Sequence, residues 1–160
     1  MTQSYRALEK WQPVATILTP SERRGISFYG QGRKKEKNMG KRILICDDAD
    51  LMRYVLKEIL TEAGYEIVGL AKDGEEGLVM YEETEPDLVI VDITMPKVDG
   101  LEVMKKIKDK SPDFPVVICS ASGQPNMVVD ALKAGADDFI IKPFHGKRVL
   151  EVVEGVIGTP

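Results

Sequence analysis

Several features are scarce in this 160-residue chain, and each scarcity excludes a class of protein. Two cysteines, Cys46 and Cys119, give neither a disulfide framework nor a zinc-ligand spacing, which indicates a reducing compartment. No apolar run reaches the roughly 18 residues of a membrane span. The longest early apolar run, residues 14–18, is too short for a secretory signal. We therefore expect a cytoplasmic globular protein without membrane insertion.

Charge divides the chain into two parts. Residues 1–38 carry eight Lys and Arg against three Asp and Glu, whereas residues 39–160 carry 14 against 23. The first part has no sustained hydrophobic period, so we expect a basic, flexible N-terminal extension there and one folded domain over residues 39–160. Contact of the basic part with nucleic acid or an anionic membrane is the alternative, and Met39 would also serve as a natural start. Because the chain ends at Pro160, we expect no DNA-binding or enzymatic output module after the domain.

Short apolar runs alternate with amphipathic stretches from residue 41 onward. The runs cover residues 43–46, 67–70, 88–91, 116–119 and 139–141. Each run is continuous, which is typical of a parallel strand covered on both faces. Helical patterns lie between the runs, and the first has one apolar face formed by Leu51, Val55, Leu56, Ile59 and Leu60. The others cover residues 74–83, 101–108, 127–134 and 148–157. Five strand–helix units predict an α/β fold: a doubly wound, five-stranded parallel sheet with helices on both faces.

Polar side chains follow four of these five strands. Asp47 and Asp48 come directly after the first strand, and Asp92 follows the third. Ser120 follows the fourth strand and Lys142 the fifth. Ligands of open α/β sheets bind outside the carboxyl ends of the strands, so these groups are expected to converge. Three carboxylates without histidine or thiolate favour Mg²⁺, which also relieves their mutual repulsion.

Common phosphate-binding loops are missing from the chain. Neither G-x-x-x-x-G-K-[ST] nor G-x-G-x-x-G occurs after the first strand, and the acidic first loop would repel a nucleotide phosphate. An aspartate can instead act as the nucleophile and form an aspartyl phosphate. Lys142 would offer a positive charge to the phosphoryl oxygens and Ser120 a hydroxyl donor. The residues therefore favour a metal-assisted phosphoryl acceptor.

Four segments carry a family resemblance: ILICDDADLMR, PDLVIVDITMPKVDG, VVICSASGQ and AGADDFIIKPF. Over residues 41–157 the chain resembles the receiver domain of two-component response regulators, in particular the single-domain chemotaxis regulators. The resemblance implies a flavodoxin-like sheet with strand order 2-1-3-4-5, which periodicity alone does not supply. It also implies that Asp92 is the phosphorylated aspartate. Asp48 would bind Mg²⁺ directly, Asp47 mainly through water, and Thr94 through its backbone carbonyl.

Further roles follow from the same resemblance. Ser120 fills the Ser/Thr switch position and Lys142 the position of the family's lysine. Phe139 stands at the aromatic switch position, where the family often has tyrosine, and its ring is expected to become buried when Ser120 moves toward the phosphoryl group. Pro143 is expected to follow a cis peptide bond.

The resemblance also implies partners and leaves alternatives. A CheA-like histidine kinase would supply the phosphoryl group, and a FliM-like flagellar motor switch protein or a phosphatase would bind the product, with no nucleic acid involved. The domain would catalyse its own phosphorylation and dephosphorylation without being an enzyme in the ordinary sense. One alternative is a phosphorelay intermediate with the same site. Another is a haloacid dehalogenase-like phosphatase, because Asp48-Ala49-Asp50 imitates the D-x-D motif of that family, although the chain has no room for a cap domain.

Overall fold

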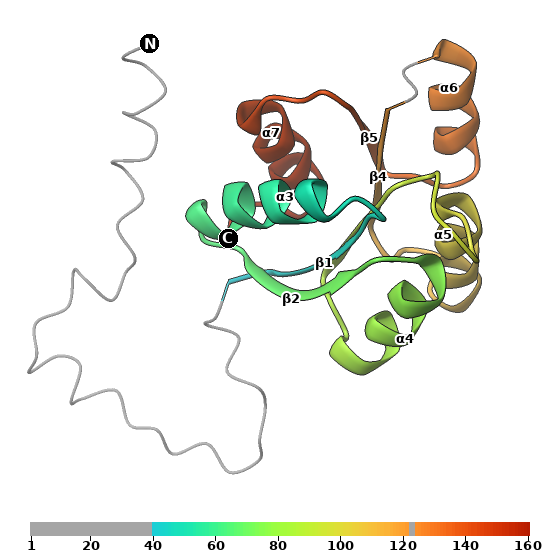
Figure 1. The fold of residues 1–160 in the computed structure, drawn as a ribbon, viewed down its shortest axis with the longest axis horizontal. Coiled ribbons are helices and arrows are strands. Elements are labelled where there is room, and N and C mark those ends of the chain that lie inside the picture. The colour runs from blue at the N-terminus through green and yellow to red at the C-terminus, as the bar shows by residue number, and fades with distance from the viewer. Residues whose placement is uncertain (1–39, 122–123) are drawn as a thin grey trace, which may run out of the picture. The chain divides into compact units, whose positions relative to one another are not determined.

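The computed structural model describes residues 40–121 and 124–160, in which five strands alternate with five helices (Figure 1). The strands are β1 (Arg42–Cys46), β2 (Glu66–Ala71), β3 (Leu88–Val91), β4 (Val116–Ser120) and β5 (Asp138–Ile141). The helices are α3 (Asp50–Glu62), α4 (Gly74–Thr84), α5 (Gly100–Lys110), α6 (Pro125–Lys133) and α7 (Gly146–Ile157). The predicted alternation of strands and helices is confirmed. The extension predicted over residues 1–38 lies outside the described residues.

The five strands form one parallel sheet in the order β2-β1-β3-β4-β5. Each parallel neighbour requires a crossover connection, and a helix supplies it. The strand order reverses at β1 and β3, so the connections leave these two strands in opposite directions. The reversal opens space for a ligand at the carboxyl ends of β1 and β3.

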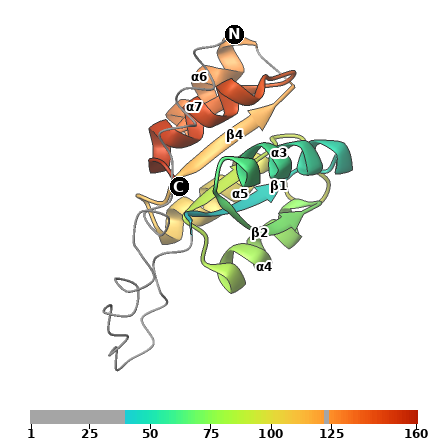
Figure 2. The ribbon, with the colours of Figure 1, turned by 90° about the vertical axis from the view of Figure 1, so that its left-hand side faces the viewer.

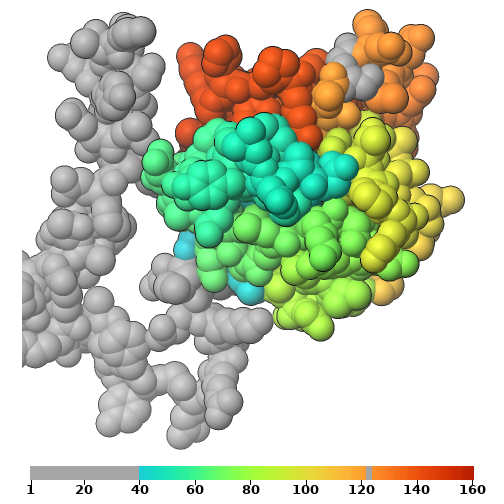
Figure 3. All heavy atoms as spheres, in the orientation of Figure 1, coloured from blue at the N-terminus to red at the C-terminus, as the bar shows by residue number. Residues whose placement is uncertain are grey.

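Helices cover both faces of the sheet. Side chains of α3 and α7 form one hydrophobic cluster with the sheet, and side chains of α5 and α6 form another on the opposite face, where α4 packs as well. Figures 1 and 2 show α3 and α4 on opposite sides of β1 and β2. In the space-filling view of Figure 3, α3 forms the front of the domain between α7 and α4.

The continuous apolar runs follow from these two layers. In β1, Ile43 and Ile45 belong to the cluster under α3 and α7, whereas Leu44 and Cys46 belong to the other. Side chains alternate between the faces of a strand, so a strand covered on both faces needs an apolar residue at every position. The burial expected on both faces is confirmed for β1, β3 and β4, whose residues are buried apart from Arg42.

Two details differ from the sequence prediction. The strand β2 is only half-buried over most of its length, because it lies at the edge of the sheet. The expectation that Leu51 shares the core-facing side of α3 is wrong, since Leu51 is 67% exposed while Leu56 and Leu60 are buried. Leu51 occupies the first turn of α3. The expected end of α3 at Gly64 is confirmed by its positive φ of 103°.

Candidate functional site

The end of β1 supplies two acids in different surroundings. Asp47 is 1% exposed, and its backbone N–H donates to the carbonyl of Ala71 at 3.0 Å. The Asp47 carboxylate accepts from the backbone N–H of Ala49 at 2.9 Å and from the ammonium of Lys142 at 2.5 Å. Asp48, the next residue, is exposed. One acid of this pair is therefore held by the protein, and the other faces outward.

The end of β3 supplies the third acid. The backbone N–H of Asp92 donates to the carbonyl of Cys46 at 2.9 Å, which continues the pairing of β1 with β3 by one residue. The Asp92 carboxylate is buried and accepts from the Thr94 backbone N–H at 3.4 Å. Its other oxygen lies 3.3 Å from the ammonium of Lys142. Asp92 thus meets the first two acids at the reversal of strand order.

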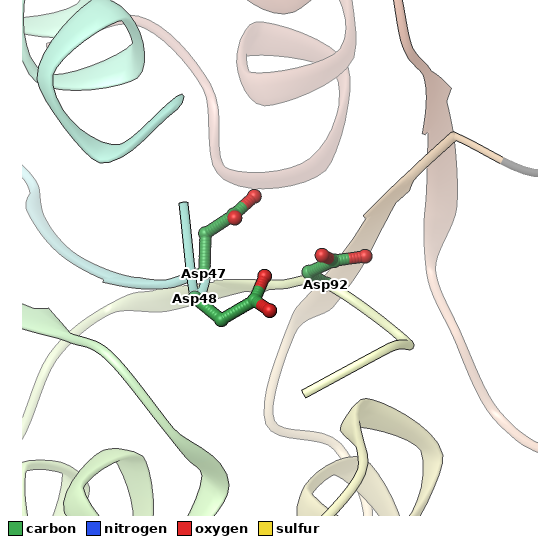
Figure 4. Close-up of side chains that lie close together, drawn as sticks. All are labelled: Asp47, Asp48 and Asp92. Atoms are coloured by element: carbon green, nitrogen blue, oxygen red, sulfur yellow. The ribbon is translucent and has the colours of Figure 1, made fainter. Parts of the chain in front are cut away.

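The three carboxylates form a group that suits a divalent cation. Asp47, Asp48 and Asp92 can each offer an oxygen, and these oxygens lie within 4.8 Å of one another. Figure 4 shows the three side chains together at the ends of β1 and β3. Hard oxygen donors of this kind fit Mg²⁺. The convergence predicted from the sequence is confirmed.

Lys142 links two of the acids from the far side of β4. It follows β5, and its backbone N–H donates to the carbonyl of Ser120 at 2.9 Å, which fixes the chain where the side chain turns toward Asp47 and Asp92. The peptide bond to Pro143 is cis, as predicted. Burial alone would lower the pKa of the Lys142 ammonium, but the hydrogen bond and charge of Asp47 raise it overall. Lys142 therefore stays charged.

For the Asp92 carboxyl, the effect of burial on the pKa outweighs that of the neighbouring Lys142. Burial raises its pKa above the usual value, and the charge of Asp47 adds to this rise. The charge of Lys142 and the hydrogen bonds from Lys142 and Thr94 oppose the rise without cancelling it. The structure thus disfavours the ionised form of the Asp92 carboxyl, and a cation bound nearby would favour it.

The two residues at the predicted switch positions lie in neighbouring strands. Ser120 is the last residue of β4 and is buried beside Ile141 of β5. Phe139 pairs with Ile118 and is 4% exposed within the cluster on the α4, α5 and α6 face. The ring that was expected to become buried on phosphorylation is therefore already inside in this structure. The predicted inward rotation of this ring would therefore have to start from a conformation other than the one described.

Four further residues complete the surroundings of the site, and only one of them, Thr94, was predicted from the sequence. Thr94 is exposed in the connection after β3, two residues from Asp92. Arg53 was not predicted from the sequence, and its guanidinium donates to the backbone carbonyl of Asp47 at 2.5 Å. Asp73 and Lys97 were not predicted either, and they form an ion pair beside the connection. The only early signal for Asp73 was an acid placed just before a helical pattern, which marks a helix N-cap.

The cysteines take no part in the site. Cys46 and Cys119 are buried free thiols, and burial raises the pKa of each to about 12. The strand β3 lies between the two strands that carry them. Among the described residues, no helix combines the length and apolar character needed to cross a membrane.

Comparison with known proteins agrees with this geometry. Residues 43–154 match the family described as response regulator receiver domain. The chemotaxis protein CheY of Thermotoga maritima is 50% identical over 118 residues, which cover 74% of this chain and 98% of that protein. The chemotaxis protein CheY of Bacillus subtilis is 49% identical over 115 residues, which cover 72% of this chain and 96% of that protein.

Solved structures show the same likeness. A chain in the crystal structure of the CheX-CheY-BeF3-Mg+2 complex from Borrelia burgdorferi superposes with a TM-score of 0.72 at 36% identity. The match covers 74% of this chain and 90% of that one. A CheY-like receiver domain protein from Methanospirillum hungatei superposes with a TM-score of 0.67 at 32% identity, over 72% of this chain and 92% of that one.

Proposed function

Because the chain belongs to the response regulator receiver family and is CheY-like over most of its length, we propose that it is a phosphorylation switch with Asp92 as the acceptor. The observation that carries this proposal is the convergence of three carboxylates and one ammonium at the reversal of strand order. Membership of this family leaves no support for the haloacid dehalogenase-like alternative.

The transfer step needs little chemistry from the protein. A carboxylate oxygen of Asp92 attacks the phosphorus of the donor, the bond from phosphorus to the leaving group breaks, and its electron pair departs with that group. Lys142, already 3.3 Å from Asp92, pairs with a phosphoryl oxygen and exchanges part of its interaction with Asp47 for it. Positioning and charge neutralisation supply most of the rate in such transfers. We therefore assign no general base to this step.

The metal ligands of the proposal are Asp48, Asp92 and the backbone carbonyl of Thr94, with Asp47 acting through water. The exposure of Asp48 and the tight pairing of Asp47 with Lys142 support this division. When bound, Mg²⁺ supplies positive charge to the phosphoryl oxygens and to the carboxylates around them.

Partners complete the proposal. A CheA-like histidine kinase donates the phosphoryl group, and the phosphorylated domain binds a FliM-like motor switch protein or a phosphatase in the cytoplasm. The relatives named as chemotaxis proteins and the relative solved with CheX support this role. Ser120 couples the site to the partner surface, because it ends the strand next to β5, whose Ile141 is exposed. Phosphorylation and its reversal are self-catalysed.

The test is phosphorylation by acetyl phosphate, followed by intact-protein mass spectrometry. The unaltered chain gains one phosphoryl group only when Mg²⁺ is present. Asp92→Asn abolishes the acid-labile adduct, because an amide does not attack phosphorus as a carboxylate does. Asp113→Asn, which removes an exposed carboxylate elsewhere, serves as the control and is labelled normally. Undiminished labelling of Asp92→Asn would reject Asp92 as the acceptor.

A further inference from the structure

The connection between β3 and α5, residues 92–99, carries both Asp92 and Thr94 and is fixed at its two ends. The N–H of Gly100 donates to the carbonyl of Ile93 at 2.8 Å. A Cβ at Gly100 would lie 2.0 Å from the carbonyl oxygen of Asp92, so the two ends of the connection touch through backbone atoms. The Asp99 carboxylate caps α5 by accepting from the N–H of Glu102 at 2.9 Å. Between these ends, Met95 is buried in the core and Val98 packs against it, whereas Lys97 is exposed and reaches outward from the connection.

Lys97 stands between these ends with an unusual backbone. Its φ is +68°, in the left-handed region that residues with a Cβ seldom adopt. Its ammonium lies 3.4 Å from a carboxylate oxygen of Asp73 and 3.5 Å from one of Glu75. Both acids belong to the start of α4, so the lysine side chain joins two connections that are far apart in sequence.

Backbone packing joins the same two connections beside this ion pair. A Cβ at Gly74, the first residue of α4, would lie 2.0 Å from the carbonyl oxygen of Val98. Asp73 precedes Gly74 as the N-cap of α4 and accepts from the N–H of Glu76 at 2.9 Å. Asp73, which forms the ion pair with Lys97, is thus itself fixed to the start of α4.

The charges match this arrangement. The Asp73 side chain is 7% exposed and that of Lys97 is 55% exposed, so a partly exposed lysine pairs with a buried acid. The hydrogen bond from Glu76 lowers the pKa of the Asp73 carboxyl, and the charge of Lys97 lowers it further. The charge of Asp73 in turn raises the pKa of Lys97. Both groups are therefore ionised near neutral pH.

We propose that Lys97 is a positioning residue: its ion pair with Asp73 and Glu75 holds residues 92–99 against α4, and so keeps the Thr94 carbonyl and the Asp92 carboxylate in place for Mg²⁺. This inference rests on the proposed function, because it takes Asp92 and Thr94 as metal ligands.

Charge and position predict opposite effects of removing Lys97, which makes the inference testable. Loss of a positive charge from the connection that carries Asp92 would by itself tighten Mg²⁺ binding. Loss of the positioning ion pair weakens it. The net result expected for Lys97→Met is Mg²⁺ binding weakened by about threefold, within the range that partly exposed ion pairs give. Lys97→Arg keeps the charge and the reach and restores binding.

The experiment measures two quantities in the full chain without any phosphodonor. Isothermal titration calorimetry gives the Mg²⁺ affinity, and hydrogen–deuterium exchange in Mg²⁺-free buffer gives the mobility of residues 94–98. The variants are Lys97→Met, Lys97→Arg, Asp73→Asn and the Lys97→Met/Asp73→Asn pair, since asparagine retains the helix cap. Lys147→Met, which breaks an exposed pair with Glu151 on α7, is the matched loss of charge.

The expected result is faster exchange and weaker Mg²⁺ binding for Lys97→Met and for Asp73→Asn, with no further loss in the double variant. The proposal is overturned if Lys97→Met has the same Mg²⁺ affinity as Lys147→Met, or the same rate of exchange over residues 94–98. It is also overturned by tighter Mg²⁺ binding, which would mean that Lys97 acts only through its charge. If the unaltered chain binds no Mg²⁺, the proposed function fails, and the positioning of the metal ligands fails with it. If the unaltered chain binds Mg²⁺ and only the Lys97 effects are absent, the proposed function stands.

Discussion

The interior of the sheet and its carboxyl edge are built from different residues, although the same strands supply both. Within β1, apolar side chains alternate between two hydrophobic layers, and the next residue, Asp47, is a buried acid. The layers contribute burial of apolar surface, which is the main favourable term in folding. The edge instead gathers three carboxylates, whose repulsion Lys142 and two backbone N–H groups partly offset. Residues of the interior stabilise the fold, whereas the edge keeps a reactive arrangement that the fold has to support.

The largest effect on stability is expected inside the layers. Ile45→Ala should lower the free energy of unfolding by about 2–5 kcal/mol. The Ile45 side chain is fully buried under α3 and α7, so its truncation leaves a cavity. Chemical denaturation followed by circular dichroism measures the loss. The control is Ile141→Ala, at a side chain that is 46% exposed, where the loss should stay below about 1 kcal/mol. Equal losses would mean that the interior is less tightly packed than the structure shows.

The next effect concerns the edge as a switch. Ser120→Ala should still be phosphorylated at Asp92, but should lose most of the gain in partner affinity that phosphorylation brings. Couplings of this kind usually amount to about 1–3 kcal/mol. Binding of a motor switch peptide, measured with and without beryllofluoride and Mg²⁺, gives the gain. Ser111→Ala, after α5, is the control. A full gain in the Ser120→Ala variant would place the coupling elsewhere.

A smaller effect of opposite sign is expected at Asp92. Because the folded protein raises the pKa of this carboxyl, its ionised form destabilises the fold without metal. Asp92→Asn should therefore raise the free energy of unfolding at pH 7 by on the order of 1 kcal/mol, a typical single-site effect. As the pH falls through the raised pKa, Asp92 becomes protonated and the advantage of the variant disappears.

Thermal unfolding in Mg²⁺-free buffer, from pH 7 down to below the pKa of Asp92, measures the difference in stability between the variant and the unaltered chain. Asp113→Asn, at an exposed site, should change the stability little at pH 7 or below the pKa of Asp92. A variant less stable than the unaltered chain at pH 7 would show that the pair with Lys142 outweighs the burial of Asp92, and the contrast between interior and edge would then be lost.

The smallest effect on stability is expected at two glycines in the helices α4 and α7. Gly155→Ala should stabilise the domain by about 0.5–1 kcal/mol, because a helical glycine is entropically unfavourable and its added Cβ meets no atom within 4 Å. Gly77→Ala in α4 should destabilise it, since that Cβ would lie 2.9 Å from the sulfur of Cys46. Thermal unfolding distinguishes the two signs. The same sign for both would contradict the packing of α4 on β1.

Much of the fold was predictable because its causes are local. A strand covered on both faces requires apolar residues at consecutive positions, and this pattern is visible in β1, β3 and β4. The exceptions are positions whose burial depends on distant parts of the chain. Leu51 fits the apolar period of α3, yet it is exposed, and β2 is half-buried because it lies at the edge of the sheet.

The site divides in the same way. The sequence by itself determined that Asp47, Asp48, Asp92 and Lys142 converge, because parallel strands bring their carboxyl ends to one edge of the sheet. Only the tertiary structure decided that Lys142 pairs most closely with Asp47, that Phe139 is already buried, and that Lys97 reaches Asp73. These contacts join residues from separate connections. Their distances depend on how the helices pack and on the backbone conformation at Lys97, which no local pattern encodes.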